Sequence, residues 1–183
     1  YYTRDSTISD HIRQQIATLI PAKSTSLRQD YPMFFRSSDD HQAEITAIER
    51  AIYTELQTIY AAGIIELSEE HRNMPKDRFE LMLIRGNIAE PYGLSELYTA
   101  KQAYETLIAR VLKEFDYFSV SRSQKLYNLL SGLELNKIIV PDIAYNAERT
   151  EQERQNTLRN LSFTTGKVIT DQRIIGTGDI VDD

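Results

Sequence analysis

Apolar residues recur at three- and four-residue steps along several stretches of this chain. The clearest stretch covers residues 38–62, and its apolar positions form one stripe: Ile45, Ile48, Ile52, Leu56 and Ile59. This spacing predicts a helix that buries one face. Gly63 follows at the position where a helix-ending glycine is common, which indicates that the helix stops there.

Two further helices are predicted from paired start signals. Thr99 is followed three residues later by Gln102, and Ser121 by Gln124, and both pairs have the spacing of a capping box. The buried stripes expected for these helices are Ala103, Leu107, Val111, Leu112 and Phe115 for the first, and Leu126, Leu129, Leu130 and Leu133 for the second.

The start of the chain predicts another helix, which Asp5 or Ser6 would cap and Pro21 would end after about Ile20. Its apolar stripe is Ile8, Ile12, Ile16 and Leu19. Residues 22–37 are expected to form a loop or an extended stretch. Its bulky apolar residues favour a buried strand over a ligand groove: Tyr31, Met33, Phe34 and Phe35.

Short strands are expected between and after these helices. Residues 78–85 (RFELMLIR) read as a strand with Gly86-Asn87 as its turn, and residues 138–140 as a brief strand that stops at Pro141. Thr150 and Glu153 have capping-box spacing and predict a charged helix. After this helix, glycines separate three short apolar runs, which predicts a strand-and-turn ending.

The predicted fold class is therefore α+β and predominantly helical. We expect a helical bundle with a few short strands at its two ends and a C-terminal strand-turn element. Residues 1–183 would form a single domain, with a mainly helical body at 38–160 and a short-strand tail at 161–183.

Composition narrows the possible functions. The chain has 183 residues, 41% of them hydrophobic and 26% charged, which is ordinary for a globular protein. Its net charge of -6 and the lack of a basic patch argue against nucleic-acid partners. There is no cysteine and no apolar stretch long enough to cross a bilayer. The chain begins with Tyr1 instead of methionine, so we expect an excised fragment or an ordered core.

No catalytic or cofactor signature is found in the sequence. The three histidines, His11, His41 and His71, lack metal-binding spacing, and no phosphate-binding loop or nucleophile elbow is present. We therefore expect no catalytic residue, metal or cofactor in this chain. Four tyrosines are expected to pack at core edges: Tyr53, Tyr60, Tyr104 and Tyr127. Four others lie near the ends of predicted elements, where they could line a pocket: Tyr92, Tyr98, Tyr117 and Tyr145.

The candidate ligand-binding residues lie where residues 142–146 meet the last predicted helix. Asp142, Tyr145, Asn146 and Arg154 supply polar groups there. A structural alternative stays open, in which these side chains cap and orient the helix.

The end of the chain carries a recognisable set of residues: Pro141-Asp142, Tyr145-Asn146, Thr150, Arg154, Gly166, Val168, Gln172, Ile174, Gly178 and Val181. In these positions it resembles the extracytoplasmic domain of bacterial seven-transmembrane HD-domain phosphohydrolases. The stretch IYAAGII at 59–65 and the helix start at Thr99 are also similar. The resemblance covers residues 38–183, and it departs from the family at Asp142, where Asn is usual, at Asn146, where Asp is usual, and at Asp171, where Gly is frequent.

This resemblance implies a sensor or interaction domain on the outer face of the bacterial inner membrane. Its parent would carry a separate cytoplasmic HD domain, a metal-dependent phosphodiesterase that acts on cyclic di-AMP. The expected partner is an unknown envelope ligand or protein, with a homodimer also open. Two alternatives from other classes remain: a soluble carboxylate-based hydrolase and a purely structural dimerisation module.

Overall fold

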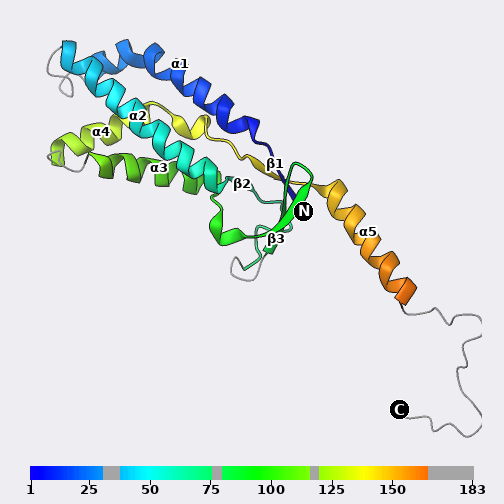
Figure 1. Ribbon diagram of the computed structural model, residues 1–183. Coiled ribbons are helices and arrows are strands. Elements are labelled where there is room, and N and C mark those ends of the chain that lie inside the picture. Colours follow the sequence, from blue (N-terminus) through cyan, green and yellow to red (C-terminus); the bar gives the residue numbers. More distant parts are fainter. Residues whose placement is uncertain (31–37, 76–79, 116–119, 165–183) are drawn as a thin grey trace, which may run out of the picture. The chain divides into compact units, whose positions relative to one another are not determined.

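The fold is that of a computed structural model, which describes residues 1–30, 38–75, 80–115 and 120–164. The chain divides into two compact units, Tyr1–Tyr145 and Asn146–Asp183. Among the described residues, the first unit holds four α-helices and one small mixed sheet, and the second holds one α-helix (Figure 1). The α+β, predominantly helical fold class is confirmed.

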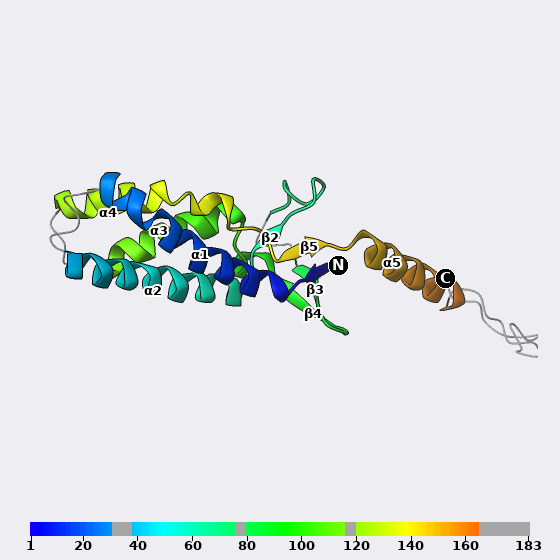
Figure 2. The same ribbon diagram turned by 90° about the horizontal axis from the view of Figure 1, so that it is seen from above.

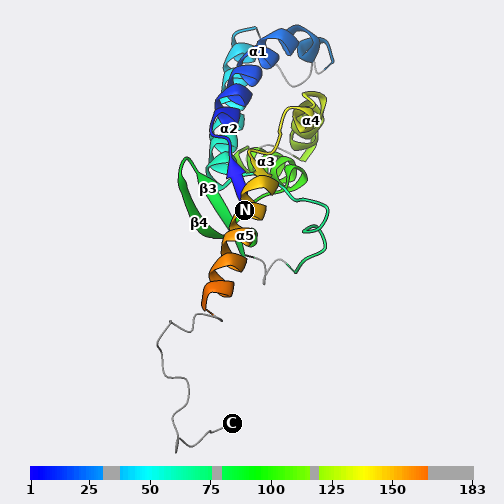
Figure 3. The ribbon, with the colours of Figure 1, turned by 90° about the vertical axis from the view of Figure 1, so that its right-hand side faces the viewer.

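The four helices of the first unit are α1 (Thr7–Asp30), α2 (Ser38–Ala62), α3 (Ala100–Glu114) and α4 (Val120–Gly132). Each packs against the next one along the chain, as the views in Figures 2 and 3 show. Helix α2 has the predicted bounds, and all five residues of its predicted stripe are buried. Their burial confirms that the three- and four-residue spacing marks the face on which the bundle packs.

Helix α1 is longer than the sequence predicts. Pro21 lies inside it, and residues 22–30, expected as loop, continue the helix. A proline removes one helical hydrogen bond, so packing must hold the helix on both sides of it. Ile20 is buried just before Pro21, and Lys23 Nζ donates to the Gly132 carbonyl at 3.2 Å just after it. The strand predicted from Tyr31, Met33, Phe34 and Phe35 falls outside the described residues.

One of the two predicted capping boxes on α3 and α4 is confirmed. The Thr99 side chain accepts from the backbone of Gln102, whose own side chain accepts from the Thr99 backbone at 3.0 Å. The prediction for α4 is wrong, because Val120 is already helical and Gln124 Nε2 donates to Asn128 Oδ1 at 3.1 Å. Both apolar stripes are buried as expected, except that Leu112 is only partly buried.

The strands of the described residues form one sheet, at one end of the bundle. They are β1 (Tyr2–Arg4), β2 (Ile65–Glu66), β3 (Glu80–Arg85), β4 (Ile88–Gly93) and β5 (Ile143–Tyr145), in the order β2-β5-β1-β3-β4. Strand β1 is parallel to β3 and antiparallel to β5. The hairpin β3–β4 turns at Gly86, as predicted, with a φ of 60°. The sheet lies at the end of the bundle where α1 begins and α2 ends (Figures 1 and 2).

The brief strand predicted at residues 138–140 is wrong. A short 3-10 helix, Leu135–Lys137, comes just before this segment, and a second one, Leu94–Glu96, connects β4 toward α3. Ile139 is buried in the helical core, and the backbone of Val140 bonds to a tyrosine hydroxyl instead of a neighbouring strand. This part of the chain joins the sheet after Pro141, where β5 begins at Ile143.

The second unit contains α5 (Ala147–Thr164). Its cap is Asn146, whose Oδ1 accepts from the backbone N–H of Arg149 at 2.8 Å. The capping box predicted at Thr150 is therefore wrong, since Thr150 lies inside the first turn and donates to the Asn146 carbonyl. The helix extends to residue 164, into the range expected as tail strands, and the rest of that tail lies outside the described residues.

Gly63 lies where the helices meet the sheet. The helices enclose one apolar core, and the sheet has a smaller second core around Tyr2, Leu83 and Ile143. At Gly63 the backbone turns with φ +115°, and a Cβ there would lie 2.6 Å from Ile143 Cδ1. Only glycine satisfies both conditions without strain. Within the described part of the chain, no helix is long and apolar enough to cross a membrane.

Candidate functional site

The most distinctive polar feature of the first unit is the carboxylate of Asp142. It is 3% exposed and is the one buried polar or charged side chain recorded for the described residues. Its oxygens accept from Arg4 Nε at 2.8 Å and from the Ile64 backbone N–H at 2.6 Å. Its own backbone N–H donates to the Ile64 carbonyl at 2.9 Å. Asp142 therefore ties together the end of β1, the link from α2 to β2, and the start of β5.

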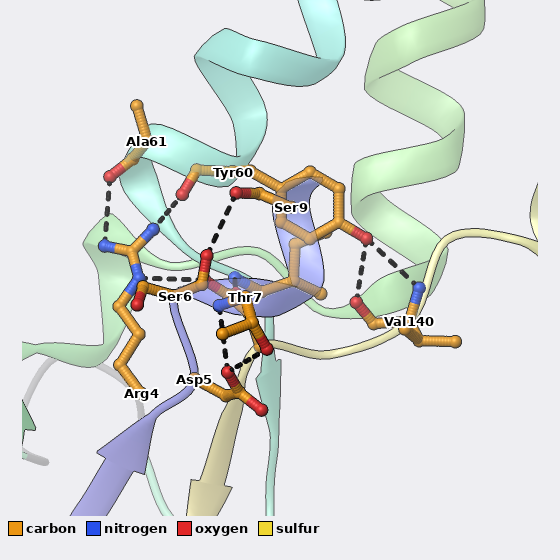
Figure 4. A network of polar contacts seen from close by, with 10 residues as sticks. Arg4, Asp5, Ser6, Thr7, Ser9, Tyr60, Ala61 and Val140 are labelled. Atoms are coloured by element: carbon orange, nitrogen blue, oxygen red, sulfur yellow. Dashed lines mark hydrogen bonds and ion pairs between the residues drawn. The ribbon is translucent and has the colours of Figure 1, made fainter. Parts of the chain in front are cut away.

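Arg4 completes the end of helix α2. The last carbonyls of a helix have no partner within it and carry partial negative charge. Helix α2 has no basic residue in its last turn. The Arg4 guanidinium instead reaches across from β1 and donates to the carbonyl oxygens of Tyr60 and Ala61 (Figure 4). A strand residue thus supplies the charge that the helix sequence lacks.

Tyr60 connects the end of α2 to the segment that precedes β5. Its hydroxyl donates to the Val140 carbonyl at 2.9 Å and accepts from the Val140 N–H at 3.2 Å (Figure 4). Burial raises the pKa of Tyr60 to about 12, the nearby Asp142 charge adds to this rise, and the hydrogen bond to Val140 opposes it. The phenol is therefore neutral near pH 7, and its hydrogen bonds join α2 to the backbone at Val140. We call Arg4, Tyr60, Val140 and Asp142 the polar hub.

A hollow of about 300 Å³ lies beside the polar hub, between α1 and α2. Its apolar lining comes from Ile12, Leu56 and Tyr60, all of which are buried. Its charged lining comes from Arg4, Asp10 and Arg13. Ligand sites typically combine an apolar lining with a few convergent polar groups, and this hollow has the volume of a small one.

The structure places the predicted site residues in two different units. Asp142 and Tyr145 belong to the first unit, and Asn146 and Arg154 to the second. Asn146 caps α5, as the structural alternative expects, whereas Asp142 is engaged in the polar hub and does not cap that helix. Arg154 is exposed on α5. A ligand role for these four residues stays a prediction, and none of them lines the hollow beside the polar hub.

Tyr145 lies in an aromatic cluster with Tyr2, at the start of β1, and His71. Its ring centroid is 5.4 Å from that of Tyr2, its partner across the two strands, and 5.4 Å from that of His71. His71 Nδ1 lies 2.8 Å from the Tyr2 hydroxyl and 2.7 Å from Ser68 Oγ. These hydroxyl contacts give His71 a structural role. In the described ranges, no group of three or more His, Asp or Glu residues is placed to hold a metal ion.

Sequence reasoning missed several residues of this region. Arg4 precedes the first helix and belongs to no periodic pattern, so no local signal marks it. Asp10 and Arg13 lie on the polar side of α1, where charged residues are ordinary. Tyr60 is expected at a core edge, and its burial confirms that position. The i, i+3 spacing of Asp10 and Arg13 is the one signal that places two of these groups on a common face.

Comparison with known protein families decides the identity of the domain. The family model described as 7TM-HD extracellular matches residues 1–183. The chain belongs to this family. The match also includes residues 1–37, which the resemblance described above does not cover. As a member, this chain is a non-catalytic, extracytoplasmic domain of a seven-transmembrane protein. No curated protein and no solved structure matches the chain.

Proposed function

We propose that this domain regulates a membrane-bound HD-type phosphohydrolase by sensing a ligand or partner in the bacterial envelope. The parent protein would lie in the inner membrane and hydrolyse cyclic di-AMP with its cytoplasmic HD domain. One observation carries the proposal: the extracellular-domain family model matches the chain from residue 1 to residue 183. The cyclic di-AMP substrate comes from the family resemblance alone.

The arrangement of side chains agrees with a regulatory role. A catalytic acid or base needs a titratable group that faces a substrate. The buried carboxylate of Asp142 is instead engaged with Arg4 and the Ile64 N–H, and His71 contacts two hydroxyls. The best-defined polar groups of the first unit therefore hold its segments together.

The sheet offers a route by which this domain would act on its parent. Strands β1 and β5 are neighbours in the middle of the sheet, with Tyr2 paired with Tyr145 and Arg4 with Ile143. The polar hub spans the same two strands, because Arg4 ends β1 and Asp142 immediately precedes β5. Asn146 follows β5 along the chain and begins the second unit. A ligand that favours one arrangement of the polar hub would bias β1 and β5 together.

The proposal is tested by removing this domain from its parent. The parent and a variant in which a short Gly/Ser linker replaces residues 1–183 are compared in membrane vesicles for cyclic di-AMP hydrolysis. We expect the variant to keep hydrolysing while its rate no longer responds to envelope extract added on the outer side. A variant that responds as strongly as the intact parent would contradict the regulatory role. Failure of both proteins to hydrolyse cyclic di-AMP would contradict the substrate.

A further inference from the structure

Two opposite charges on α1 adjoin the hollow between α1 and α2. Asp10 and Arg13 are three residues apart, so they share one face of the helix, and both line the hollow. Both side chains are exposed. Neither makes an ion pair with the other, and no side-chain hydrogen bond of either is found in the described part of the chain. An anionic and a cationic group therefore lie on one face of α1 beside the hollow, and neither is hydrogen-bonded or ion-paired through its side chain within the described residues.

The lining of the hollow combines apolar and polar side chains, and part of it is held in place. Ile12 on α1 and Leu56 on α2 are 2% and 4% exposed, and both line the hollow. The Tyr53 hydroxyl donates to the Arg13 carbonyl at 3.1 Å, which fixes the tyrosine ring against α1. Burial raises the pKa of Tyr53, with the charge of Glu49 adding and that of Arg13 opposing, so this phenol stays neutral. The hollow thus has a partly apolar lining, a Tyr53 ring held against α1, and charged groups of both signs on α1.

This charge pattern selects among ligand classes. A simple anion would meet Arg4 and Arg13 but would be repelled by Asp10, and a simple cation would meet the opposite difficulty. A zwitterion that carries both charges close together satisfies both sides. At about 300 Å³, the hollow is at the lower limit of known ligand sites, which favours a single small molecule over a long peptide.

We infer that the hollow between α1 and α2 binds a free α-amino acid with an apolar side chain. Its ammonium group pairs with Asp10, its carboxylate pairs with Arg13, and its side chain packs against Tyr53 and the apolar part of the lining. This inference deepens the proposed sensor function and rests on it, since it names the class of ligand that is sensed. Arg4, which lines the same hollow, connects the site to the polar hub.

The test is a calorimetric titration of the 183-residue chain with three probes: L-leucine, N-acetyl-L-leucine, which lacks the ammonium, and L-leucinamide, which lacks the carboxylate. We expect L-leucine to bind, and each derivative to bind about 10- to 100-fold more weakly, because each loses one charged hydrogen-bonding partner. No saturable binding of L-leucine, or equal binding of L-leucine and either derivative, would overturn the inference.

Two variants assign each charge to its partner. In Asp10→Asn, N-acetylation of the probe should no longer weaken binding, and in Arg13→Gln, amidation of the probe should no longer weaken it. The matched controls Glu90→Gln and Arg72→Gln change the same charges at exposed positions away from the hollow and should bind like the unaltered chain. Asp10→Asn and Arg13→Gln variants that keep the full discrimination of the unaltered chain would place the site elsewhere and overturn the inference.

Because this test uses no hydrolase, its failure leaves the domain-removal experiment on the parent to decide the proposed function separately.

Discussion

The helical body and the sheet end of the first unit are stabilised in different ways. The body of α1 to α4 encloses a continuous apolar core of Ile, Leu, Val and aromatic side chains. The sheet end has a smaller core, and beside it a buried carboxylate, an arginine and a tyrosine join three segments that are distant in sequence.

This difference matters for regulation. An apolar core has many interchangeable contacts and tolerates little change in shape, so it serves as a rigid scaffold. A polar hub depends on a few directional bonds, and its arrangement changes when one of them is lost or replaced by a ligand. We therefore expect stability to depend mainly on the helical body and signalling on the sheet end.

The largest expected effect is a cavity in the helical body. Ile52 is 0% exposed in the centre of α2, so Ile52→Ala should lower the free energy of unfolding by about 4 kcal/mol. The measurement is urea denaturation followed by circular dichroism. The control Val120→Ala, at a helical position that is 90% exposed, should change this free energy by less than about 0.5 kcal/mol. Equal effects of the two substitutions would show that the apolar core does not dominate stability.

Breaking the polar hub should have the next largest effect. Asp142→Ala leaves Arg4 without its ion-pair partner and the Ile64 N–H without its acceptor, so we expect a loss of about 3 kcal/mol. The control Glu105→Ala removes an exposed ion pair with Lys101 and should cost less than about 0.5 kcal/mol. If the two variants melt alike, Asp142 is not a structural centre.

The junction between the two regions should be sensitive to a single methyl group. Gly63→Ala adds a Cβ that would meet Ile143 at 2.6 Å, in a backbone conformation with φ +115°, and should cost about 2 kcal/mol or more. Gly86→Ala is the matched control, because Gly86 also has a positive φ but nothing lies within 4 Å of the added Cβ. It should cost about 1 kcal/mol, and a Gly86→Ala variant at least as destabilised as Gly63→Ala would rule out the crowding at Ile143.

The smallest expected effect comes from the raised pKa of Tyr60, and it is measured as a change of stability at alkaline pH. The pKa of Tyr60 is raised to about 12 in the folded chain, from about 10 in an unfolded one. Between these values the unfolded chain loses the proton first, so the Tyr60 contribution is complete below pH 10 and disappears as the pH rises through 12. The free energy of unfolding should therefore fall more steeply across this range in the unaltered chain than in Tyr60→Phe. Tyr127→Phe, at a residue 46% exposed, should keep the steep fall, and a steep fall in Tyr60→Phe as well would assign it to another group.

The same two regions explain what the sequence could predict. The periodic stripe of α2 and the capping box of Thr99 depend on local spacing, and both are confirmed. The continuation of α1 past Pro21 is accompanied by a hydrogen bond from Lys23 to Gly132, which are 109 positions apart. Asp142 is recognisable as a candidate residue, but its partner Arg4 lies 138 positions away and its partner Ile64 lies 78 positions away. No local pattern encodes such pairings, so the polar hub and the adjoining hollow become visible only in the folded structure.

The division between scaffold and signalling region is tested most directly by two mildly destabilising variants of the parent protein. Ile52→Val trims the helical body, and Asp142→Asn removes the charge of the polar hub; each should cost the domain about 1 kcal/mol. Cyclic di-AMP hydrolysis by the two variant parents is measured in membrane vesicles, at a temperature at which this domain remains folded in both variants. We predict that Asp142→Asn changes the basal rate about fivefold, as a bias of about 1 kcal/mol implies, while Ile52→Val leaves it unchanged. Equal rates in the two variants would contradict the account.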